Sequence, residues 1–232
     1  MLITALIPAL DEAGTIAETV RAARAIPGVT RVIVIDDGSR DGTDRLAEEA
    51  GAKVVRLFGS HGKGAALEFG AGRAEDADIV LLLDGDLGSA ASQGELLLAP
   101  LLSNEADMAI AAFPRTEGKA GFGLVKGLAR FGIERMGGDF DATAPLSGQR
   151  ALTRSCLATV RPFSAGYGVE VGLTIRALRA GFRLVEVETT MSHAATGRDL
   201  KGFIHRGRQF VHVALALLGL WREKTPVRRS GL

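Results

Sequence analysis

The alternation of short apolar runs with helical segments over the first 112 residues constrains the fold more than any other feature of this sequence. Five runs rich in Val, Ile, Leu and Ala are expected to form strands at 2–8, 31–36, 53–57, 78–83 and 107–112. The segments 15–25, 41–50, 64–74 and 92–102 between them have helical character. Runs that are apolar on both faces are typical of buried parallel strands, and strand–helix alternation predicts right-handed crossovers. This half of the chain predicts an α/β fold with a mostly parallel sheet flanked by helices.

The second half of the chain departs from this rhythm. Residues 113–150 are rich in glycine, and we expect helices at 124–136, 169–180 and 200–220 with a strand at 183–188. No linker rich in Pro or Ser separates the two halves. We therefore interpret residues 1–232 as a single domain whose first half, 1–115, binds a nucleotide.

Charge is balanced over the whole chain but not along it. The sequence has 28 Lys/Arg and 27 Asp/Glu, and this near-neutral balance argues against a nucleic-acid partner. Residues 197–232 contain eight Lys/Arg and two Asp/Glu, a net charge of +6, which leaves −5 for the remainder. A basic C-terminal region suggests an anionic partner, either a phosphate or a membrane surface, although simple solvation explains it too.

Three features that the sequence lacks indicate the cellular compartment in which the protein is expected. Cys156 is the one cysteine, so an intrachain disulfide is impossible. The most apolar stretch, 210–221, is shorter than the roughly 20 residues that span a bilayer. The N-terminus has no basic residues before its apolar run, unlike a signal peptide. We expect a cytoplasmic protein, with peripheral contact at the inner membrane face as an additional expectation.

Polar residues follow each of the first four expected strands, at the edge where open α/β sheets bind ligands. These residues lie at 8–12, 36–43, 59–64 and 84–86. The sharpest group is Asp84-Gly85-Asp86, because two carboxylates around a glycine can face one point and suit Mg²⁺ or Mn²⁺. An Asp-Gly turn that closes a strand is the structural alternative.

The residues at the other strand ends also have one functional and one structural interpretation each. Asp36 and Asp37 can accept hydrogen bonds from a base or ribose, or can form a turn before the next helix. Lys63 in Gly62-Lys63-Gly64 can contact phosphate at a helix N-terminus, or can be a solvated lysine. The motif is not a Walker A loop, because Leu57 and Gly64 occupy positions that need Gly and Ser/Thr.

Taken together, four motifs resemble glycosyltransferase family 2 in their order and spacing. They are Ile7-Pro8-Ala-Leu-Asp11-Glu12, Val34-Ile-Asp36-Asp37-Gly-Ser-Arg-Asp-Gly-Thr43, Gly62-Lys63-Gly64-Ala-Ala-Leu67 and Leu83-Asp84-Gly-Asp86. The resemblance covers residues 2–115 strongly and the rest more loosely. It implies a GT-A (Rossmann-like) fold, a nucleoside-diphosphate sugar donor and a divalent metal.

The resemblance also implies roles for individual residues of the first half. The residues it assigns to the nucleotide-sugar pocket are Pro8, Leu10, Glu12, Asp36, Asp37, Lys63, Asp84 and Gly85. Asp86, with Asp84, is implied as a metal ligand. The sequence departs from the family at Asp11, usually Asn, and at Gly88, where dolichol-phosphate mannose synthases tend to have Gln. The Gln-x-x-Arg-Trp motif of processive synthases is missing, which disfavours a polysaccharide synthase.

The acceptor is expected to bind the second half, 116–232, together with its C-terminal helix. The residues implied for acceptor binding are Arg115, Ser147, Gln149, Arg150 and Arg198. Arg115 is also a catalytic candidate with Asp86, and Arg150 could instead be a surface charge. Glu170 is a candidate general base, a group that orients others, or a buried carboxylate paired with an arginine. His193 resembles the metal-binding histidine of glucosyl-3-phosphoglycerate synthases, or is a structural histidine.

The resulting prediction is a metal-dependent glycosyltransferase that uses Mg²⁺ or Mn²⁺. It takes a sugar from a nucleotide donor, with a UDP-sugar favoured and GDP-mannose possible, to a polyprenyl phosphate or a small phospho-acid. A sugar nucleotidyltransferase and a non-catalytic nucleotide-binding GT-A module are the alternatives. A homodimer is a further expectation, and the stereochemical outcome stays open.

Overall fold

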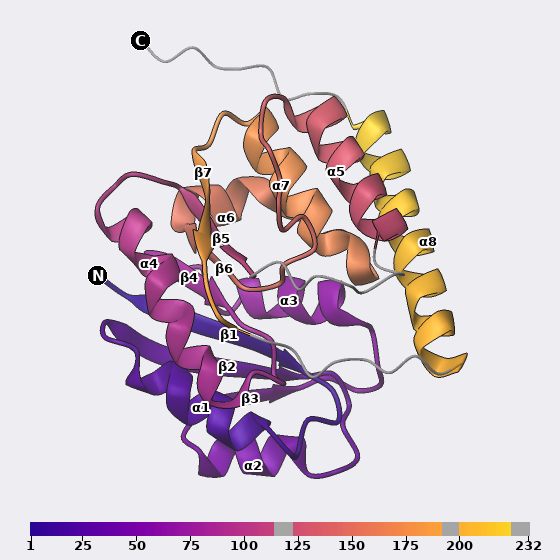
Figure 1. Cartoon of the computed structure of the whole chain (residues 1–232). Helices are drawn as coiled ribbons and strands as arrows, with labels where there is room; N and C mark the ends of the chain where they lie inside the picture. Colours follow the sequence, from indigo (N-terminus) through magenta and orange to yellow (C-terminus); the bar gives the residue numbers. More distant parts are fainter. Residues whose placement is uncertain (114–122, 192–199, 224–232) are drawn as a thin grey trace.

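A seven-stranded sheet with strand order β3-β2-β1-β4-β6-β5-β7 forms the centre of the molecule (Figure 1). This computed structural model describes residues 1–113, 123–191 and 200–223. The strands are β1 Ile3–Ala9, β2 Val29–Asp36, β3 Lys53–Arg56, β4 Ile79–Leu82, β5 Met108–Ala112, β6 Arg150–Thr153 and β7 Leu184–Glu188. The expected α/β class and mostly parallel sheet are confirmed, since only β6 runs antiparallel to its neighbours β4 and β5 among these strands.

Parallel pairing aligns the strand ends that carry the sequence motifs. Ala9 pairs with Asp36 at the ends of β1 and β2, and the Asp37 amide donates to the Ala9 carbonyl at 2.9 Å. The Leu83 amide donates to the Leu6 carbonyl at 3.1 Å, which brings the end of β4 beside β1. The three strand ends therefore form one edge, called the rim below.

Helices cover both faces of the sheet because buried strands alternate their side chains between two cores. The helices are α1 Ile16–Ala25, α2 Thr43–Glu49, α3 Lys63–Ala71, α4 Gly94–Leu102, α5 Gly123–Gly137, α6 Arg154–Val160, α7 Val169–Arg179 and α8 Leu200–Arg222, with the 3₁₀ turns η1 Gly88–Gln93 and η2 Gly166–Gly168. Ile7 of β1 packs with residues of α1, α2 and α4, whereas its neighbour Leu6 packs with α3, α6 and α7.

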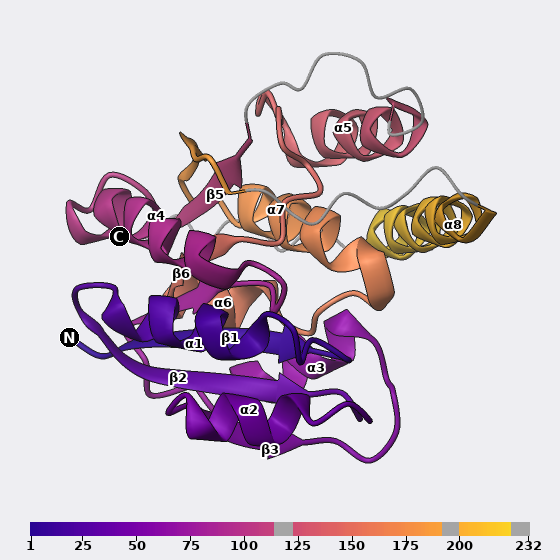
Figure 2. The same cartoon turned by 60° about the horizontal axis from the view of Figure 1, so that its bottom comes forward.

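A third apolar cluster joins α5, α7 and α8. It includes Ile133 from α5, Ile175 from α7 and Val213 from α8. Figure 1 and Figure 2 show α5 and α8 side by side at the outside of the molecule, with α7 next to them. In the part of the chain that is described, no helix has the length and apolarity needed to cross a membrane.

The second half contains the elements that sequence reasoning missed. Neither β6 nor α6 was expected, because Arg150–Thr153 is short and includes a charged residue, and α6 covers only Arg154–Val160. β6 inserts between β4 and β5, so residues from beyond position 116 belong to the same sheet as the strands that carry the sequence motifs.

Candidate active site

Asp37 organises the loop that precedes α3. Its carboxylate accepts hydrogen bonds from the amides of His61 at 2.9 Å and Gly62 at 2.7 Å, and from the Ser60 hydroxyl at 3.0 Å. The side chain is nearly buried as a result. Asp37 therefore fixes the approach to the first residue of α3, and its predicted contact with a base or ribose stays a prediction.

The Asp36 carboxylate, like that of Asp37, contacts groups of the protein itself. Its Oδ1 accepts a hydrogen bond from the Ser39 amide at 3.0 Å, and its Oδ2 lies 3.4 Å from Nε of Arg56. Asp36 is fully buried at the end of β2. The two aspartates thus lie together at the rim, as the sequence predicted, but hold the loops on either side of it.

Lys63 begins α3 and lies between two carboxylates. Its Nζ is 2.6 Å from Oδ1 of Asp84 and 3.0 Å from Oε1 of Glu170. Burial by itself lowers the pKa of Lys63, but the charges of Asp84 and Glu170 outweigh burial and raise the pKa above its usual value. The Lys63 ammonium group is therefore shared between two carboxylates at the rim.

Gln149 extends this arrangement into the second half of the chain. Its Nε2 donates to Oδ2 of Asp84 at 2.7 Å, and its Oε1 accepts from the Ser147 hydroxyl at 3.3 Å. Lys63, Asp84, Gln149 and Glu170 form the set that we call the Lys63 network. It joins the end of β4, the start of α3, the turn before β6 and the start of α7.

Gly148 allows the turn before β6 to press directly on the Lys63 network. A Cβ at this position would lie 2.4 Å from Nζ of Lys63 and 2.8 Å from Oδ2 of Asp84. Gly64 makes a similar close approach on the other side, where a Cβ would lie 2.1 Å from the Ser164 carbonyl oxygen. Sequence reasoning did not assign these two glycines a role, although both stand inside the motifs that it singled out.

Arg150 supports the same turn from beneath. Its Nε donates to the Ser147 carbonyl at 2.9 Å and its Nη1 to the Thr174 hydroxyl at 2.8 Å, while Nη2 has no hydrogen-bond partner. The side chain is 0% exposed, and burial lowers the pKa of Arg150 to about 10. The predicted contact between Arg150 and an acceptor stays a prediction. Thr174 is a supporting residue that no sequence signal pointed to.

Asp84 and Asp86, where a cation is expected, act electrostatically on Glu12. The pKa of Glu12 is raised by burial and by the negative charges of Asp86 and Asp84. A bound Mg²⁺ or Mn²⁺ would relieve this repulsion, and carboxylate oxygens are the ligands that both ions prefer. Within the described ranges no three His, Cys, Asp or Glu side chains form a ready ligand group. The expected third ligand, His193, lies outside those ranges.

The remaining predicted residues divide into those at the rim and those that are not described. Pro8 and Leu10 stand at the end of β1, and Leu10 is exposed. The Gly85 carbonyl accepts hydrogen bonds from the hydroxyls of Thr15 and Thr19 at 3.1 and 2.9 Å, which fixes the Asp84–Asp86 turn. Arg115 and Arg198, like His193, fall outside the described residues.

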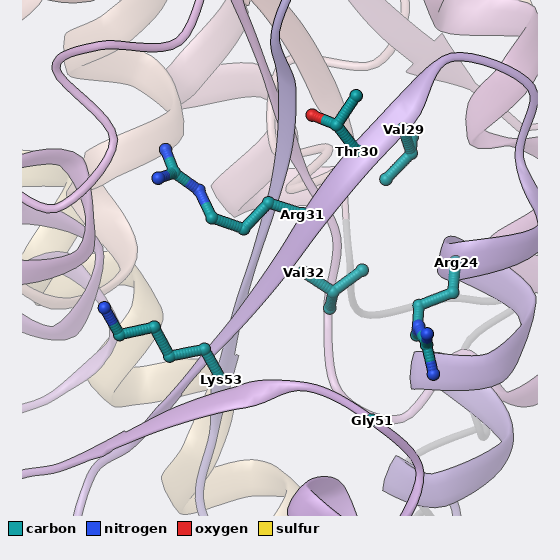
Figure 3. Close-up of a pocket in the computed structure, with 7 residues that line it drawn as sticks. All are labelled: Arg24, Val29, Thr30, Arg31, Val32, Gly51 and Lys53. Carbon is teal, nitrogen blue, oxygen red and sulfur yellow. The ribbon is translucent and has the colours of Figure 1, made fainter.

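A separate cavity of about 270 Å³ opens at the amino ends of β2 and β3, away from the rim. Figure 3 shows that Arg31 and Lys53 extend to one side of it and Arg24 to the other. Arg31 is bound to Asp76 at 2.6 Å and Arg24 to the Ala50 carbonyl at 3.1 Å. None of the sequence motifs at the strand ends lines this cavity, and the rim remains the better candidate for the active site.

The comparisons with known proteins concern the family and the fold of the chain. The family described as Glycosyl transferase family 2 matches residues 4–154. Glycosyltransferase AglJ of Haloferax volcanii is 35% identical over 202 residues, which cover 84% of this chain and 64% of AglJ. Glucosyl-3-phosphoglycerate synthase of Mycolicibacterium smegmatis is 30% identical over 238 residues, which cover 94% of this chain and 78% of the synthase. The chain thus spans slightly less than two thirds of AglJ.

Solved structures extend the likeness over nearly the whole chain. Glucosyl-3-phosphoglycerate synthase from Mycobacterium tuberculosis in complex with Mn²⁺, UDP-glucose and phosphoglyceric acid matches with a TM-score of 0.75 and 30% identity, over 94% of this chain and 80% of that one. The same synthase with Mg²⁺ and UDP matches with a TM-score of 0.78 and 29% identity, over 100% and 82% of the two chains. The expected GT-A fold and enzyme class are confirmed, and the chain belongs to glycosyl transferase family 2.

Proposed function

We propose that this chain transfers a hexose from a UDP-sugar to a small phosphorylated carboxylic acid, with Mg²⁺ or Mn²⁺ as cofactor. The observation that carries the proposal is the Lys63 network, which couples the nucleotide-binding strand ends to the turn before β6 and to α7. The crystal structures of the similar synthase with UDP-glucose, Mn²⁺ and phosphoglyceric acid support this choice of donor, metal and acceptor.

On the donor side, the proposal assigns the diphosphate to Lys63 and the two aspartates of the Asp84–Asp86 turn. Lys63, paired with Asp84, would lie near the nucleotide, and Asp84 and Asp86 would hold the cation together with His193. When bound, the metal would neutralise the negative charge that develops on the nucleoside-diphosphate leaving group. Pro8, Leu10, Glu12, Asp36, Asp37 and Gly85 complete the proposed pocket for the nucleotide sugar.

On the acceptor side, we assign Ser147 and Gln149 to the turn that meets the acceptor, with Arg115 and Arg198 as proposed anion-binding groups. Arg150 holds this turn in place. Glu170 is almost buried and paired with Lys63 at 3.0 Å, which suits it to orienting the lysine better than to accepting a proton. We therefore propose Glu170 as a positioning residue.

A different reaction and different substrates compete with this proposal. Family membership favours sugar transfer over nucleotidyl transfer. GDP-mannose as donor and a polyprenyl phosphate as acceptor remain the competing substrates. A cytoplasmic location, a peripheral membrane contact and a homodimer stay predictions.

A radiochemical transfer assay separates these substrates. The purified chain is incubated with labelled UDP-glucose or GDP-mannose, with phosphoglycerate or polyprenyl phosphate, and with Mn²⁺, Mg²⁺ or EDTA. We expect a labelled phospho-acid only from UDP-glucose and phosphoglycerate with a divalent ion. Asp86→Asn should abolish it, while the exposed Asp139→Asn should not. Product formed only from GDP-mannose, or only on polyprenyl phosphate, would contradict the substrates proposed. Nucleotide binding without turnover would indicate a non-catalytic module.

A further inference from the structure

Large apolar side chains are exposed in an unusual concentration on α5 and α8. Among the described residues, the outward side chains of these helices form a set that we call the α5–α8 surface: Leu124, Phe131, Val211, Leu215, Leu218 and Trp221. Leu124 is 81% exposed and Trp221 is 76% exposed. Soluble chains rarely leave a contiguous apolar patch of this kind without a use for it.

The two helices form one surface because they are in close contact. A Cβ on Gly132 of α5 would lie 2.3 Å from Cδ2 of Leu217 on α8, so the backbones approach closely there. Phe131 and Leu218, both exposed, are the sequence neighbours of these two residues. Arg179 of α7 donates to the carbonyls of Met136 at 3.0 Å and Leu220 at 2.8 Å, which ties the ends of both helices to the body.

Core packing explains only one face of α8. Val213 and Leu220, seven residues apart, are buried in the cluster shared with α5 and α7. Val211, Leu215 and Leu218 follow a spacing of four and three residues and lie on the outward face, where they remain exposed. This second apolar face has no function in the core.

The charges around α8 indicate what covers this face. Residues 210–221 contain no Asp, Glu, Lys or Arg. Basic residues stand before this run and after it, at Lys201, Arg206, Arg208, Arg222, Lys224, Arg228 and Arg229. If two copies of the chain paired through α8, the basic segments of the two copies would come together whether the helices ran parallel or antiparallel. Their like charges would repel each other, which disfavours this contact. An anionic lipid headgroup layer is complementary to both ends at once.

We propose that the α5–α8 surface docks this enzyme on an anionic lipid bilayer, with α8 lying in the plane of the interface. The apolar face would enter the boundary between headgroups and acyl chains, and the basic residues on both sides of 210–221 in the sequence favour an anionic headgroup layer. Trp221 is well placed for the interface, which favours amphipathic rings. Docking requires no particular acceptor, so vesicle binding and the transfer assay succeed or fail separately.

Trp221 is the one tryptophan of the chain and provides the probe. The full chain is mixed with vesicles of phosphatidylcholine, with or without phosphatidylglycerol, and followed by flotation and by Trp emission with brominated lipid as quencher. We expect co-flotation, a blue shift and quenching only with phosphatidylglycerol. Leu215→Ser with Leu218→Ser should weaken binding about tenfold or more, because two apolar side chains no longer leave water. The matched control is Leu96→Ser with Leu102→Ser, two exposed leucines on α4.

The remaining outcomes would overturn the proposal. One is the absence of vesicle binding by the wild-type chain, whether or not sedimentation finds a dimer that Leu215→Ser with Leu218→Ser dissociates. Another is equal binding to neutral and anionic vesicles. A third is equal loss in the α4 control. Thermal melts of both double variants establish that they are folded.

Discussion

Nζ of Lys63 lies 2.6 Å from Oδ1 of Asp84, although the two residues come from different structural elements, the first turn of α3 and the end of β4. The side chains are 24% and 20% exposed, so the pair is largely withdrawn from water. Glu170 and Gln149 complete the surroundings at 3.0 and 2.7 Å. Through this ion pair and its two neighbours, the first half of the chain and the second half become one cluster of polar side chains.

Removing the lysine should damage both stability and activity. Lys63→Met leaves Asp84 and Glu170 facing each other without a cation, and we expect a loss of about 1–3 kcal/mol in the free energy of unfolding. Transfer activity should fall at least about tenfold. Urea denaturation and the transfer assay measure the two effects. Lys53→Met, at an exposed position on β3, should change stability by no more than about 0.5 kcal/mol. A Lys63 variant as stable as the Lys53 control would contradict the importance of the ion pair.

A single methyl group on Gly148 should displace the Lys63 side chain. The added Cβ of Gly148→Ala would stand 2.4 Å from Nζ of Lys63, so the ammonium group must move. Since small misplacements of a binding group are costly in catalysis, we expect activity to fall about tenfold or more. Gly127→Ala is the control, because its Cβ meets nothing within 4 Å on α5 and should stabilise the helix by roughly 0.5–1 kcal/mol. If the two variants were equally active, the close contact between Gly148 and the Lys63 side chain would not matter for activity.

Nucleotide binding should depend on Asp86 and on a divalent ion. UDP at 100-fold over its dissociation constant stabilises the folded state by about 2.7 kcal/mol, which corresponds to a rise of several degrees in Tm. We expect this rise with Mn²⁺ present, and its loss in Asp86→Ala or with EDTA. The exposed Asp139→Ala variant should respond like the wild type. An undiminished shift in EDTA would argue against metal-assisted binding.

Asp107 should contribute stability that disappears in acid. Hydrogen bonds from Arg183 hold the pKa of Asp107 below its usual value, with side-chain distances of 3.0 and 3.1 Å. A carboxylate whose folded pKa is depressed stabilises above its unfolded pKa of about 3.9 and loses that contribution as pH falls through the folded value. Urea denaturation from pH 7 to pH 2 should give a difference of roughly 1 kcal/mol between wild type and Asp107→Asn that shrinks with acid. A constant difference would rule out this linkage.

Cys156 should be unreactive in the native chain. It is fully buried, and burial raises the pKa of its thiol to about 12. At pH 8 only about one thiol in ten thousand is then ionised, and the thiolate is the reactive form. Reaction with Ellman's reagent should be slow in buffer and complete within minutes in denaturing urea. Rapid labelling of the native chain would contradict the buried position.

Sequence patterns predict the first half of this fold well because most of its strands are buried on both faces. β1, β4 and the second part of β2 are largely apolar runs, and such runs can be recognised without knowing which strands lie beside them. β6 escapes prediction since Arg150–Thr153 is only four residues long and its place depends on pairing with β4 and β5.

For the candidate site, the sequence predicts individual residues but not the contacts between them. Asp84 and Lys63 follow from strand ends and a glycine motif, but their contact does not, because only the folded chain brings these positions together. Gln149 lies 65 residues from Asp84 in sequence, and family resemblance alone pointed to its region. The raised pKa of Glu12 likewise depends on burial and on the charges of Asp86 and Asp84, which are distant in sequence.

The reversed direction of β6 has a consequence for how this enzyme could diversify. β5 leaves the rim at Ala112 and β6 enters the sheet from the same edge at Arg150, so the intervening chain begins and ends on one side of the molecule. Insertions between these two anchor points would therefore leave every strand register unchanged. The same span includes α5 and the turn at Ser147–Gln149, so a change of its sequence reaches both the third apolar cluster and the Lys63 network.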